Sequence, residues 1–432
     1  MGCLISVIRA GAALVLGVVI FVGFLFFLIL NNFSDKLLSA DFYKDTIVAE
    51  DTYNRIYEEV LLDEALLDTT QELLGDIQIV TQQEIVDLMR EIMPPAYIQE
   101  QVEASIDRTV DYVNEDVDEL GAYIELAEPL RNVKPVMFAY IDRRIDELRV
   151  EDPCISACSP SAVTDLAARF VQKFEDLAAG QVPTTVPSLR ALDPLCRQLI
   201  FASAFDFLLV SSNLGAETTR LLRNNREQLR IPFEDGDTLA MLKAAARPLA
   251  EPLMDQAIDR VREDLIDGDR FDLIRQLAEW DSSTSEAQIR ADLDEGREWI
   301  SRARSFGEVT TLIMVIGGAI LMGLVNFPQL TGMLRGPGMA LLLTGVVFFV
   351  LGKVAESEVP DRLTALIETS ADRVSGVPPS VTDLGGDILI SFGAQLTDGF
   401  VGPSLTLIIV GAILIGASFF VFPIKRFIPF VK

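Results

Sequence analysis

Four stretches without a single charged side chain constrain this chain more than any other feature. The stretches are Ala10–Ser34, Val309–Leu334, Gly336–Gly352 and Gly399–Ile424, and each is rich in Leu, Ile, Val and Phe. About 17–25 apolar residues in a helix span the hydrocarbon core of a bilayer. We therefore expect an all-α membrane protein with four transmembrane helices. The expected helices cover residues 10–32, 309–329, 337–354 and 400–423.

The first apolar stretch has two interpretations, a cleaved signal peptide and an uncleaved membrane anchor. Its apolar run of roughly 20 residues is longer than the 7–15 that are typical of a signal peptide. The chain leaves the stretch as Leu-Asn-Asn-Phe-Ser-Asp, without a small-residue cleavage site. The pattern favours the anchor.

The charges that flank the apolar stretches differ in sign on their two sides. The short connections, residues 1–9, 329–337 and 423–432, contain no acid. Their basic side chains are Arg9, Arg335, Lys425, Arg426 and Lys432. Short loops rich in Lys and Arg stay in the cytoplasm, so this sorting predicts a plasma membrane protein with its ends, residues 1–9 and 424–432, on the cytoplasmic side.

The two long connections are strongly acidic. Residues 35–305 hold 55 acids and 28 bases, and residues 356–398 hold 8 acids and 2 bases. We expect both segments outside, as a large extracytoplasmic helical domain inserted between passes 1 and 2 and an amphipathic segment between passes 3 and 4. The cytoplasmic side keeps too few residues for a kinase, nucleotide-binding or signalling domain.

Helix signals dominate the acidic segments. Thr81 and Glu84 form a possible capping box, and Pro94 and Pro95 stop the helix that follows it. A second stripe at helical spacing runs Ile98, Val102, Ile106, Val110 and Val113. Further helices are expected at 162–177, 362–374 and 381–396, the last two packing as a collar under the main exterior domain. Short strands are expected at Thr184–Val186 and Ile231–Phe233.

Proline placement gives two further expectations. Pro248 and Pro252 interrupt an apolar stripe that runs from Leu242 to Leu265, so we expect a break or kink there. A possible capping box at Ser283 and Glu286 starts a helix that meets no proline before the second apolar stretch. That helix is expected to enter the bilayer as a continuous stalk.

Three of the four cysteines lie in the predicted exterior, where disulfides form readily. We favour a Cys158–Cys196 bridge, because it closes a proline-rich loop with few apolar anchors; a tight Cys154–Cys158 ring is the alternative. Cys154 then has no assigned role. Cys3 follows Gly2 in a loose lipidation pattern, which an adjacent transmembrane helix makes unnecessary.

Three acidic clusters are candidate calcium sites, and the foremost consists of Asp267, Asp269 and Asp272 around Gly268. None follows the spacing of an EF-hand loop. Solvated turns and helix caps are the simpler explanation on so acidic a chain.

Composition excludes several chemistries. The chain has no histidine, which removes histidine-based nucleophile activation and histidine-ligated zinc or haem. It also lacks the Walker A, GxGxxG, GxSxG and SxxK motifs. We expect no cofactor and no enzymatic activity; a carboxylate pair, as in glycoside hydrolysis, is the remaining catalytic alternative.

Small residues four apart allow membrane helices to approach closely. Such pairs occur on the first, second and fourth passes, as Ala13 and Gly17, Ala319 and Gly323, and Ala412 and Gly416. No charge lies within the passes, and this argues against a pump or an ion-coupled transporter. The pattern predicts a compact helical base, within one chain or between copies.

These features favour a non-enzymatic cell-envelope protein whose acidic exterior mediates partner binding or surface assembly. Its expected partners are the lipid bilayer and other envelope proteins or copies of itself, and no nucleic acid, because a negative field repels phosphates. A receptor that signals through another membrane protein is a variant of this hypothesis. An oligomeric channel, or a carrier of lipids or other apolar molecules, is the alternative.

The predicted orientation is testable with a protease added to sealed, right-side-out cells. The protease should cut the acidic segment 35–305 and spare a tag placed near Lys432, because only the former is exposed to the medium. Digestion of the tag with protection of the acidic segment would show that the orientation is inverted.

Overall fold

The structure is a computed structural model that describes residues 2–32, 36–63, 81–153, 158–178, 183–210, 216–280, 284–327, 330–371 and 378–424. It is mostly helical (82%), as the sequence predicts. The chain forms two compact units. Unit 1 consists of Met1–Arg55, Glu100–Ala122 and Leu273–Lys432, and unit 2 consists of Ile56–Gln99 and Tyr123–Asp272. The long acidic segment 35–305 therefore contributes to both units.

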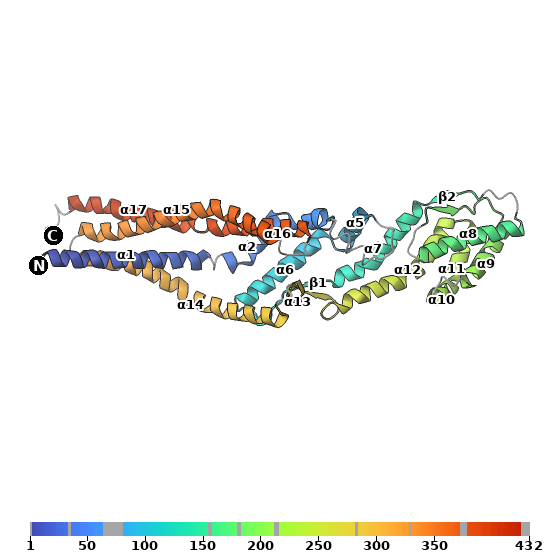
Figure 1. Cartoon of the computed structure of the whole chain (residues 1–432), viewed down its shortest axis with the longest axis horizontal. Helices are drawn as coiled ribbons and strands as arrows, with labels where there is room; N and C mark the ends of the chain where they lie inside the picture. Colours follow the sequence, from blue (N-terminus) through green and yellow to red (C-terminus); the bar gives the residue numbers. More distant parts are fainter. Residues whose placement is uncertain are drawn as a thin grey trace. The chain divides into compact units, whose positions relative to one another are not determined.

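Unit 1 contains the apolar helices. Its helices are α1 (Gly2–Asn32), α2 (Ala40–Ala49), α3 (Thr52–Arg55), the later part of α6 (Pro95–Val113), α13 (Leu273–Trp280), α14 (Glu286–Val325), α15 (Leu330–Ala371), α16 (Pro379–Asp398) and α17 (Val401–Ile424). Three segments of the described chain are long and apolar enough to cross a membrane, namely Gly11–Asn32, Thr331–Ile367 and Pro379–Phe419. A shorter apolar segment, Val309–Val325, forms the end of α14. In Figure 1, α1, α15 and α17 run along one another.

Contacts within unit 1 bring together the ends of the four charge-free stretches. At one end, Leu30 lies against Gly307, and the Asn32 side chain lies against Gly399. The Asn32 amide nitrogen also donates a hydrogen bond to the Leu396 carbonyl oxygen at 2.5 Å. Gly352 lies against Phe400 at the same end. At this end, the apolar parts of α1, α14, α15 and α17 therefore stop at the same level.

The opposite ends also meet. Gly323 of α14 packs against the main chain of Met333 in α15, and Asn326 caps α14 beside Gly336. The Asn326 amide nitrogen donates to the Met322 carbonyl oxygen of its own helix at 2.9 Å. Arg335, predicted in a loop, lies inside α15, and its guanidinium lies 4.7 Å from the centre of the Phe419 ring. Lys425, Arg426 and Lys432 lie outside the described residues.

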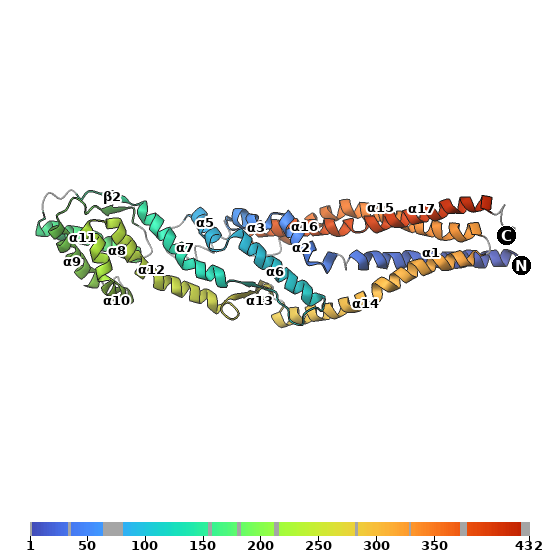
Figure 2. The ribbon, with the colours of Figure 1, turned by 180° about the vertical axis from the view of Figure 1, so that it is seen from behind.

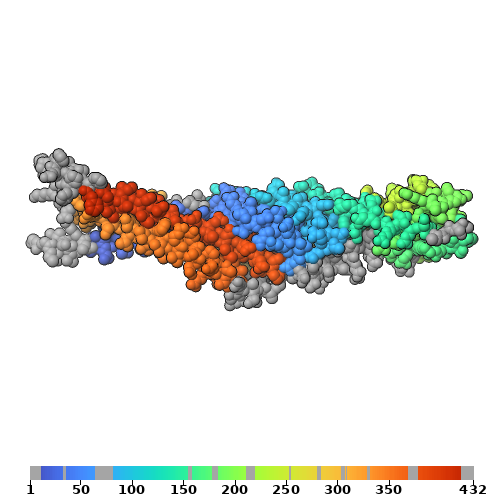
Figure 3. Space-filling model, turned by 90° about the horizontal axis from the view of Figure 1, so that it is seen from above, coloured from blue at the N-terminus to red at the C-terminus, as the bar shows by residue number. Residues whose placement is uncertain are grey.

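Helices α15 and α17 pack through small residues at intervals of seven. Gly338, Gly345 and Gly352 face α17, and Ser404, Gly411 and Ser418 face α15 or are fully buried. A Cβ added at Gly345 would lie 2.9 Å from the Ile408 main-chain nitrogen. Seven residues make almost two helical turns, so each set forms one stripe. On the face shown in Figure 3, α15 (orange) lies directly against α17 (red).

The small pairs expected from the sequence have different surroundings. Gly17 faces Met322, Ala319 packs against the buried cluster, and Gly323 approaches Met333. Ala13 is half-buried. Ala412 is exposed, and nothing in the chain lies within 4 Å of a Cβ added at Gly416. Within one chain, therefore, α17 packs through Gly411 and not through the Ala412–Gly416 pair.

Large side chains fill the remaining space between these helices. Ile20, Phe24 and Leu28 of α1 are buried against Val315 of α14 and Phe348 of α15. The Phe24 and Phe348 rings meet edge to face with centroids 5.6 Å apart. Such an arrangement is favourable for aromatic pairs.

The helices of unit 1 continue past the apolar stretches. α14 is one helix from Glu286 to Val325, as the stalk expectation requires, but its N-cap is Ser285, whose side chain accepts from the Gln288 amide. Ser283 lies outside the described residues. α15 continues through Pro360, so the expected helix at 362–374 is the end of α15. The expected 381–396 helix is α16.

α16 contacts the start of the exterior segment. The Gln395 amide donates to the Thr46 hydroxyl at 2.6 Å, and Arg55 pairs with Asp387 at 2.9 Å. The Phe392 ring lies 5.3 Å from that of Phe42. Within unit 1, α16 thus packs against α2, and the collar under the exterior domain stays a prediction.

Unit 2 is a helical assembly with two very short sheets. Its helices are a π-helical turn, η2 (Ile56–Val60), α5 (Gln82–Ile92), the start of α6, α7 (Ala127–Asp146), α8 (Pro160–Ala178), α9 (Pro194–Val210), α10 (Ala216–Asn224), α11 (Arg226–Asp235) and α12 (Thr238–Glu263). β1 (Tyr123–Glu125) pairs antiparallel with β4 (Arg270–Asp272). β2 (Arg149–Glu151) pairs in parallel with β3 (Thr185–Pro187). The helices α7 and α12 run side by side in both Figure 1 and Figure 2.

Several local expectations are confirmed in unit 2. Thr81 accepts from the Glu84 amide while the Glu84 carboxylate accepts from the Thr81 amide at 2.9 Å, which is the expected capping box. α5 ends before Pro94, and Pro95 is the first residue of α6. The helix expected at 162–177 is α8, and the strand expected at 184–186 is β3 within one residue.

The structure differs from two expectations in unit 2. Ile231–Phe233 is helical, within α11, because Leu229 and Phe233 lie one turn apart and are both buried; Arg230 also pairs at 2.7 Å with Glu227 and at 2.8 Å with Glu234. Of the break or kink expected at Pro248 and Pro252, α12 shows no break. Buried residues before and after the prolines, among them Leu242 and Ile258, stabilise both halves, and this packing offsets the roughly 3 kcal/mol cost of an interior proline.

The close packing of α15 and α17 predicts a contrast between two glycines. Gly411→Ala should destabilise the protein by about 1–3 kcal/mol, because the new Cβ would lie 2.6 Å from the Leu342 main-chain nitrogen, which cannot move aside. Gly416→Ala is the matched control on the same helix and should be neutral. The midpoint of heat-induced loss of the monodisperse species in detergent measures both. Equal midpoints for the two variants would contradict the packing.

Candidate functional site

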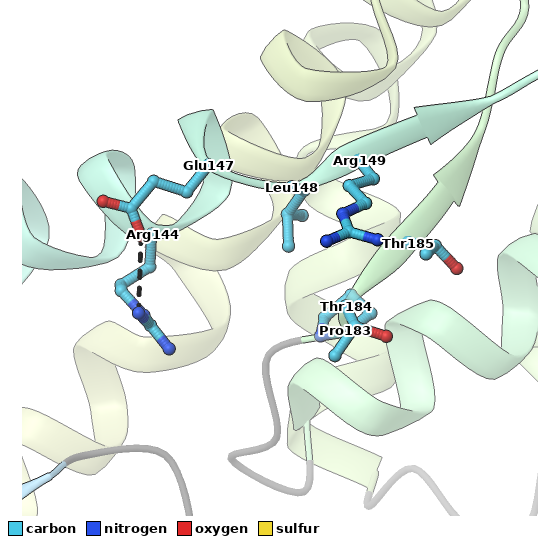
Figure 4. Close-up of a pocket in the computed structure, with 7 residues that line it drawn as sticks. All are labelled: Arg144, Glu147, Leu148, Arg149, Pro183, Thr184 and Thr185. Carbon is cyan, nitrogen blue, oxygen red and sulfur yellow. Dashed lines mark hydrogen bonds and ion pairs between the residues drawn. The ribbon is translucent and has the colours of Figure 1, made fainter.

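An open cavity lies at the junction of α7 with β2. It has a volume of about 450 Å³ and is lined by Arg144, Glu147, Leu148, Arg149, Pro183, Thr184 and Thr185. Figure 4 shows the guanidinium groups of Arg144 and Arg149 on the same side of the chain, with Leu148 between them. The Arg149 amide donates to the Thr184 carbonyl oxygen at 3.4 Å, which ties β2 to β3. The lining is thus mostly charged and hydroxyl side chains.

A smaller cavity of about 140 Å³ adjoins the first and shares Arg144 and Glu147 with it. Arg144 is held between two carboxylates, with nitrogen–oxygen distances of 3.4 Å to Glu84 and 3.4 Å to Glu147. Arg143 pairs with Glu91 at 3.5 Å. The positive charges therefore have acidic neighbours, and the ion pairs connect α5 to the end of α7.

The titration of two groups in the smaller cavity is perturbed. The hydrogen bond from the Thr81 amide, followed by the hydroxyl of the same residue and the charge of Arg144, holds the pKa of Glu84 below its usual range. Burial raises the pKa of Tyr140. Glu84 is therefore ionised and Tyr140 is neutral at pH 7. The charge of Glu84 has a structural role, because Glu84 caps α5 and forms an ion pair with Arg144.

Among the described residues of unit 2, large exposed apolar side chains gather on one face of α9. One side of α9 is buried in the core of the unit, and its buried residues are Cys196, Ile200, Phe201, Ala204, Phe205 and Leu208. The other side carries four large apolar side chains: Leu195 is 68% exposed, Leu199 58%, Phe207 45% and Val210 84%. It also carries the exposed polar residues Gln198 and Asp206. We name the exposed residues Leu195, Gln198, Leu199, Ala202, Asp206, Phe207 and Val210 the α9 face. A helix with large apolar residues on both sides is normally buried on both.

The α9 face is held in place by the core and a disulfide. Cys196 is bonded to Cys158, which precedes α8, with the two Cα atoms 5.8 Å apart, as the sequence predicts. The ring centroid of Phe201 in α9 lies 5.4 Å from that of Phe233 in α11, and the Phe233 centroid lies 5.0 Å from that of Phe170 in α8. Figures 1 and 2 show α8, α9, α10 and α11 gathered in one cluster. Cys154 lies outside the described residues.

The acidic residues weighed as calcium ligands do not come together. Asp267 and Gly268 have φ angles of 54° and 76° and form the tight turn of a hairpin, with the Ile266 amide donating to the Arg270 carbonyl oxygen at 2.8 Å. Asp267 pairs with Arg270 at 3.6 Å, and Asp272 is buried in β4. Asp269 contributes its main-chain carbonyl, which accepts from the Leu126 amide at 2.7 Å. Across the described residues, no three Asp, Glu or Cys side chains are placed to hold a metal ion.

Sequence reasoning missed the α9 face and both cavities. The segment from Leu195 to Val210 has the composition of a buried helix, and only its exposure marks it as unusual. One sequence signal could have indicated the α9 face: between Leu195 and Val210 the only charged residues are Arg197 and Asp206, so apolar residues extend beyond one side of the helix. The cavities depend on Arg144 and Thr184 meeting across 40 residues of chain, which no local pattern reveals.

Neither a known family model, nor a curated protein, nor a solved structure matches this chain. Its function is therefore argued from its own residues.

Ionised Glu84 predicts a pH-dependent stability of α5. Glu84→Gln should weaken the helix by roughly 0.5–1 kcal/mol at pH 7, because it loses the charge that the Thr81 amide and Arg144 stabilise. The pKa of Glu84 is lowered in the folded chain, so the stabilisation is complete above the unfolded pKa and is lost as pH falls through the folded pKa. The two proteins should therefore become alike in acid. Hydrogen exchange of the amides of residues 82–92 at each pH measures the difference.

Asp87→Asn is the control, because it removes a charge from an exposed position of the same helix. A Glu84→Gln effect at pH 7 that is no larger than that of Asp87→Asn would contradict this role for Glu84.

Proposed function

We propose that this chain is a non-enzymatic integral protein of the cell envelope that crosses the plasma membrane four times. Its helical exterior, mainly unit 2, binds a partner protein or takes part in a surface assembly. The exposed apolar α9 face is the observation that carries this proposal, because soluble domains rarely leave such a surface uncovered unless it serves an interaction.

Four passes are supported by the way the apolar helices end together. The Val309–Val325 segment of α14 is 17 residues long, or about 25 Å, which is short for a membrane span. Its helix continues beyond the segment toward Glu286, and Gly307 packs against Leu30 at the level where Asn32 meets Gly399. A helix that packs against α1 and α15 over this length is expected to cross the membrane if they do.

The orientation rests on the distribution of charge. Every short connection is basic and free of acids, and both long connections are acidic. The same arrangement places residues 1–9 and 424–432 inside the cell, and unit 2 outside. An exterior with 55 acids against 28 bases in residues 35–305 favours cations and basic proteins over nucleic acid or anionic lipid headgroups.

The α9 face differs from this acidic surface. Its one charged residue is Asp206, and its large apolar side chains extend from Leu195 to Val210, about 22 Å along the helix. The core and the Cys158–Cys196 bond hold the helix rigidly from behind. A rigid apolar surface costs little ordering entropy on binding, which suits it to a protein partner.

The alternative hypothesis, that the protein carries apolar molecules, has less support. The cavity of about 450 Å³ is lined by two arginines, a glutamate and two threonines, and apolar cargo requires an apolar lining. We therefore favour partner binding at a surface over transport through an interior.

The proposal is tested by affinity isolation of the full-length protein from mild detergent, followed by mass spectrometry. We expect the wild-type protein to retain at least one protein, a further copy of itself included, that a Leu199→Glu, Val210→Glu double variant loses, because a buried unpaired carboxylate is strongly unfavourable. Ile231→Glu is the control, since Ile231 is 55% exposed on α11, outside the α9 face. Recovery of the wild-type protein as a monomer without any partner would contradict the proposal.

A further inference from the structure

The larger cavity of unit 2 has a lining with more positive than negative charge, although the chain is strongly acidic. The chain has a net charge of −28, whereas this lining contains two arginines and one glutamate. Salt screens exposed charges beyond roughly 8 Å at physiological ionic strength, so the groups that line a cavity determine its potential more than distant acids do. The cavity can therefore attract a small anion.

Arg149 is the cation of this lining that no acid neutralises. The other arginine, Arg144, is held by Glu84 and Glu147, each at 3.4 Å. Among the described residues, Arg149 forms no ion pair, either with Glu147 or with Glu151, the acids two positions before and after it. Its guanidinium is thus available to a group from another molecule.

Two threonine hydroxyls belong to the same lining. Thr185 is the partner of Arg149 in the register of β2 and β3, and Thr184 directly precedes β3. Figure 4 shows the Arg149 side chain extending from β2 toward the β3 side of the cavity. Within the described part of the chain, neither hydroxyl has a hydrogen-bond partner. Each can therefore donate a hydrogen bond to a ligand oxygen.

The number of available charges decides which anion fits. A guanidinium can donate two parallel hydrogen bonds to a carboxylate or to a phosphate. A phosphate monoester carries a charge of about −1.5 to −2 at pH 7, so Arg149 alone would leave part of it unneutralised in a cavity that also contains Glu147. A carboxylate carries one negative charge, which one guanidinium balances. The lining therefore favours a carboxylate.

The volume and the walls of the cavity limit the size of the molecule. About 450 Å³ corresponds to about fifteen waters at roughly 30 Å³ each, which is enough for a small organic molecule. Leu148 and Pro183 are the apolar residues of the lining, and they can contact a short carbon skeleton. A long apolar chain would find too little apolar wall.

We infer that this cavity binds the carboxylate group of a small organic molecule, with the Arg149 guanidinium as the principal donor and the hydroxyls of Thr184 and Thr185 beside it. The inference goes beyond the proposed function, because it concerns a small ligand and does not involve the α9 face. A free organic acid and the end of a short peptide present the same carboxylate. Binding measurements distinguish these two sources.

Saturation-transfer NMR with the full-length protein in nanodiscs tests the inference. The probes are two acids, glycerate and glucuronate, and their uncharged counterparts, glycerol and glucose. At least one acid should bind more tightly than its counterpart, because only the acid carries the carboxylate. Equal binding of acids and counterparts would overturn the inference. Tighter binding of glycerol 3-phosphate than of glycerate would overturn the choice of a carboxylate over a phosphate.

Triglycine and its C-terminal amide identify the source of the carboxylate. Binding of triglycine in preference to both acids, with loss of binding in the amide, would assign the site to a peptide end. Preference for glycerate or glucuronate would assign it to a free acid. Absence of binding by both acids and by triglycine at millimolar concentration, in protein that remains monodisperse, would overturn the inference.

Substitution of Arg149 tests its role directly. Arg149→Gln should lower the affinity for the best-bound probe roughly tenfold or more, because it removes the charge-assisted hydrogen bonds. Arg149→Lys should restore only part of it, since an ammonium cannot form the paired bonds of a guanidinium. Arg131→Gln is the matched control, because it removes an exposed cation of α7 outside both cavities. Equal affinities of Arg149→Gln and Arg131→Gln would overturn the inference.

Salt dependence gives an independent measurement. Added salt should weaken binding of the acid, because it screens the attraction between the carboxylate and Arg149; an affinity that does not change with salt would contradict the inference. A protein that binds an acid but retains no protein partner would support this inference and contradict the proposed function. A protein that retains a partner but binds no carboxylate would do the reverse.

Discussion

The structure of unit 1 depends on the packing of the apolar lengths of α1, α14, α15 and α17, which contact one another mainly through nonpolar side chains and small residues. Hydrocarbon gives such helices no hydrophobic reason to associate, so close van der Waals contact has to hold them together. Gly345 and Gly411 bring the main chains of α15 and α17 into contact, and Phe24 and Phe348 fill the wider spaces. At one end of these helices, the Asn32 side chain of α1 donates a hydrogen bond to the Leu396 carbonyl oxygen of α16. The level at which the four apolar stretches end follows from these contacts.

Unit 2 is built on a different principle. Water drives its apolar residues into a core formed by α8, α9, α11 and α12, and the Cys158–Cys196 bond closes a segment whose Val186 and Leu189 are buried in that core. The core does not use all the apolar surface that α9 offers. The excess lies on the α9 face, and it gives a domain with a strongly acidic exterior one surface that prefers protein to water. The docking role that we propose for this face and the structural role of the core thus fall on the same helix.

The success of prediction differed with the range of the interactions involved. The capping box at Thr81 and Glu84, the stop at Pro94 and the disulfide between Cys158 and Cys196 were predictable, because each depends on a few neighbouring residues or on a constrained loop. The strand expected at Ile231–Phe233 was wrong, since Arg230 with its two glutamates favours a helix that β-propensity did not reveal. The prolines of α12 predicted a break or a kink, and α12 has no break, because the burial of Leu242 and Ile258 outweighs a local penalty. The α9 face could not be predicted, because exposure is a property of what does not pack against a residue.

Sequence alone determined that the chain is helical, that it carries apolar segments able to cross a membrane and that acidic and basic connections are sorted to opposite ends of those segments. These properties are local, because a charge-free run or a basic loop has the same solvation whatever its neighbours are. Only the tertiary structure decided that α17 packs through Gly411 and not Gly416, that Asp267 forms a turn with Gly268, and that one side of α9 stays uncovered. Those outcomes depend on which surfaces pack against each other, and that depends on the shapes of residues that are far apart in the chain.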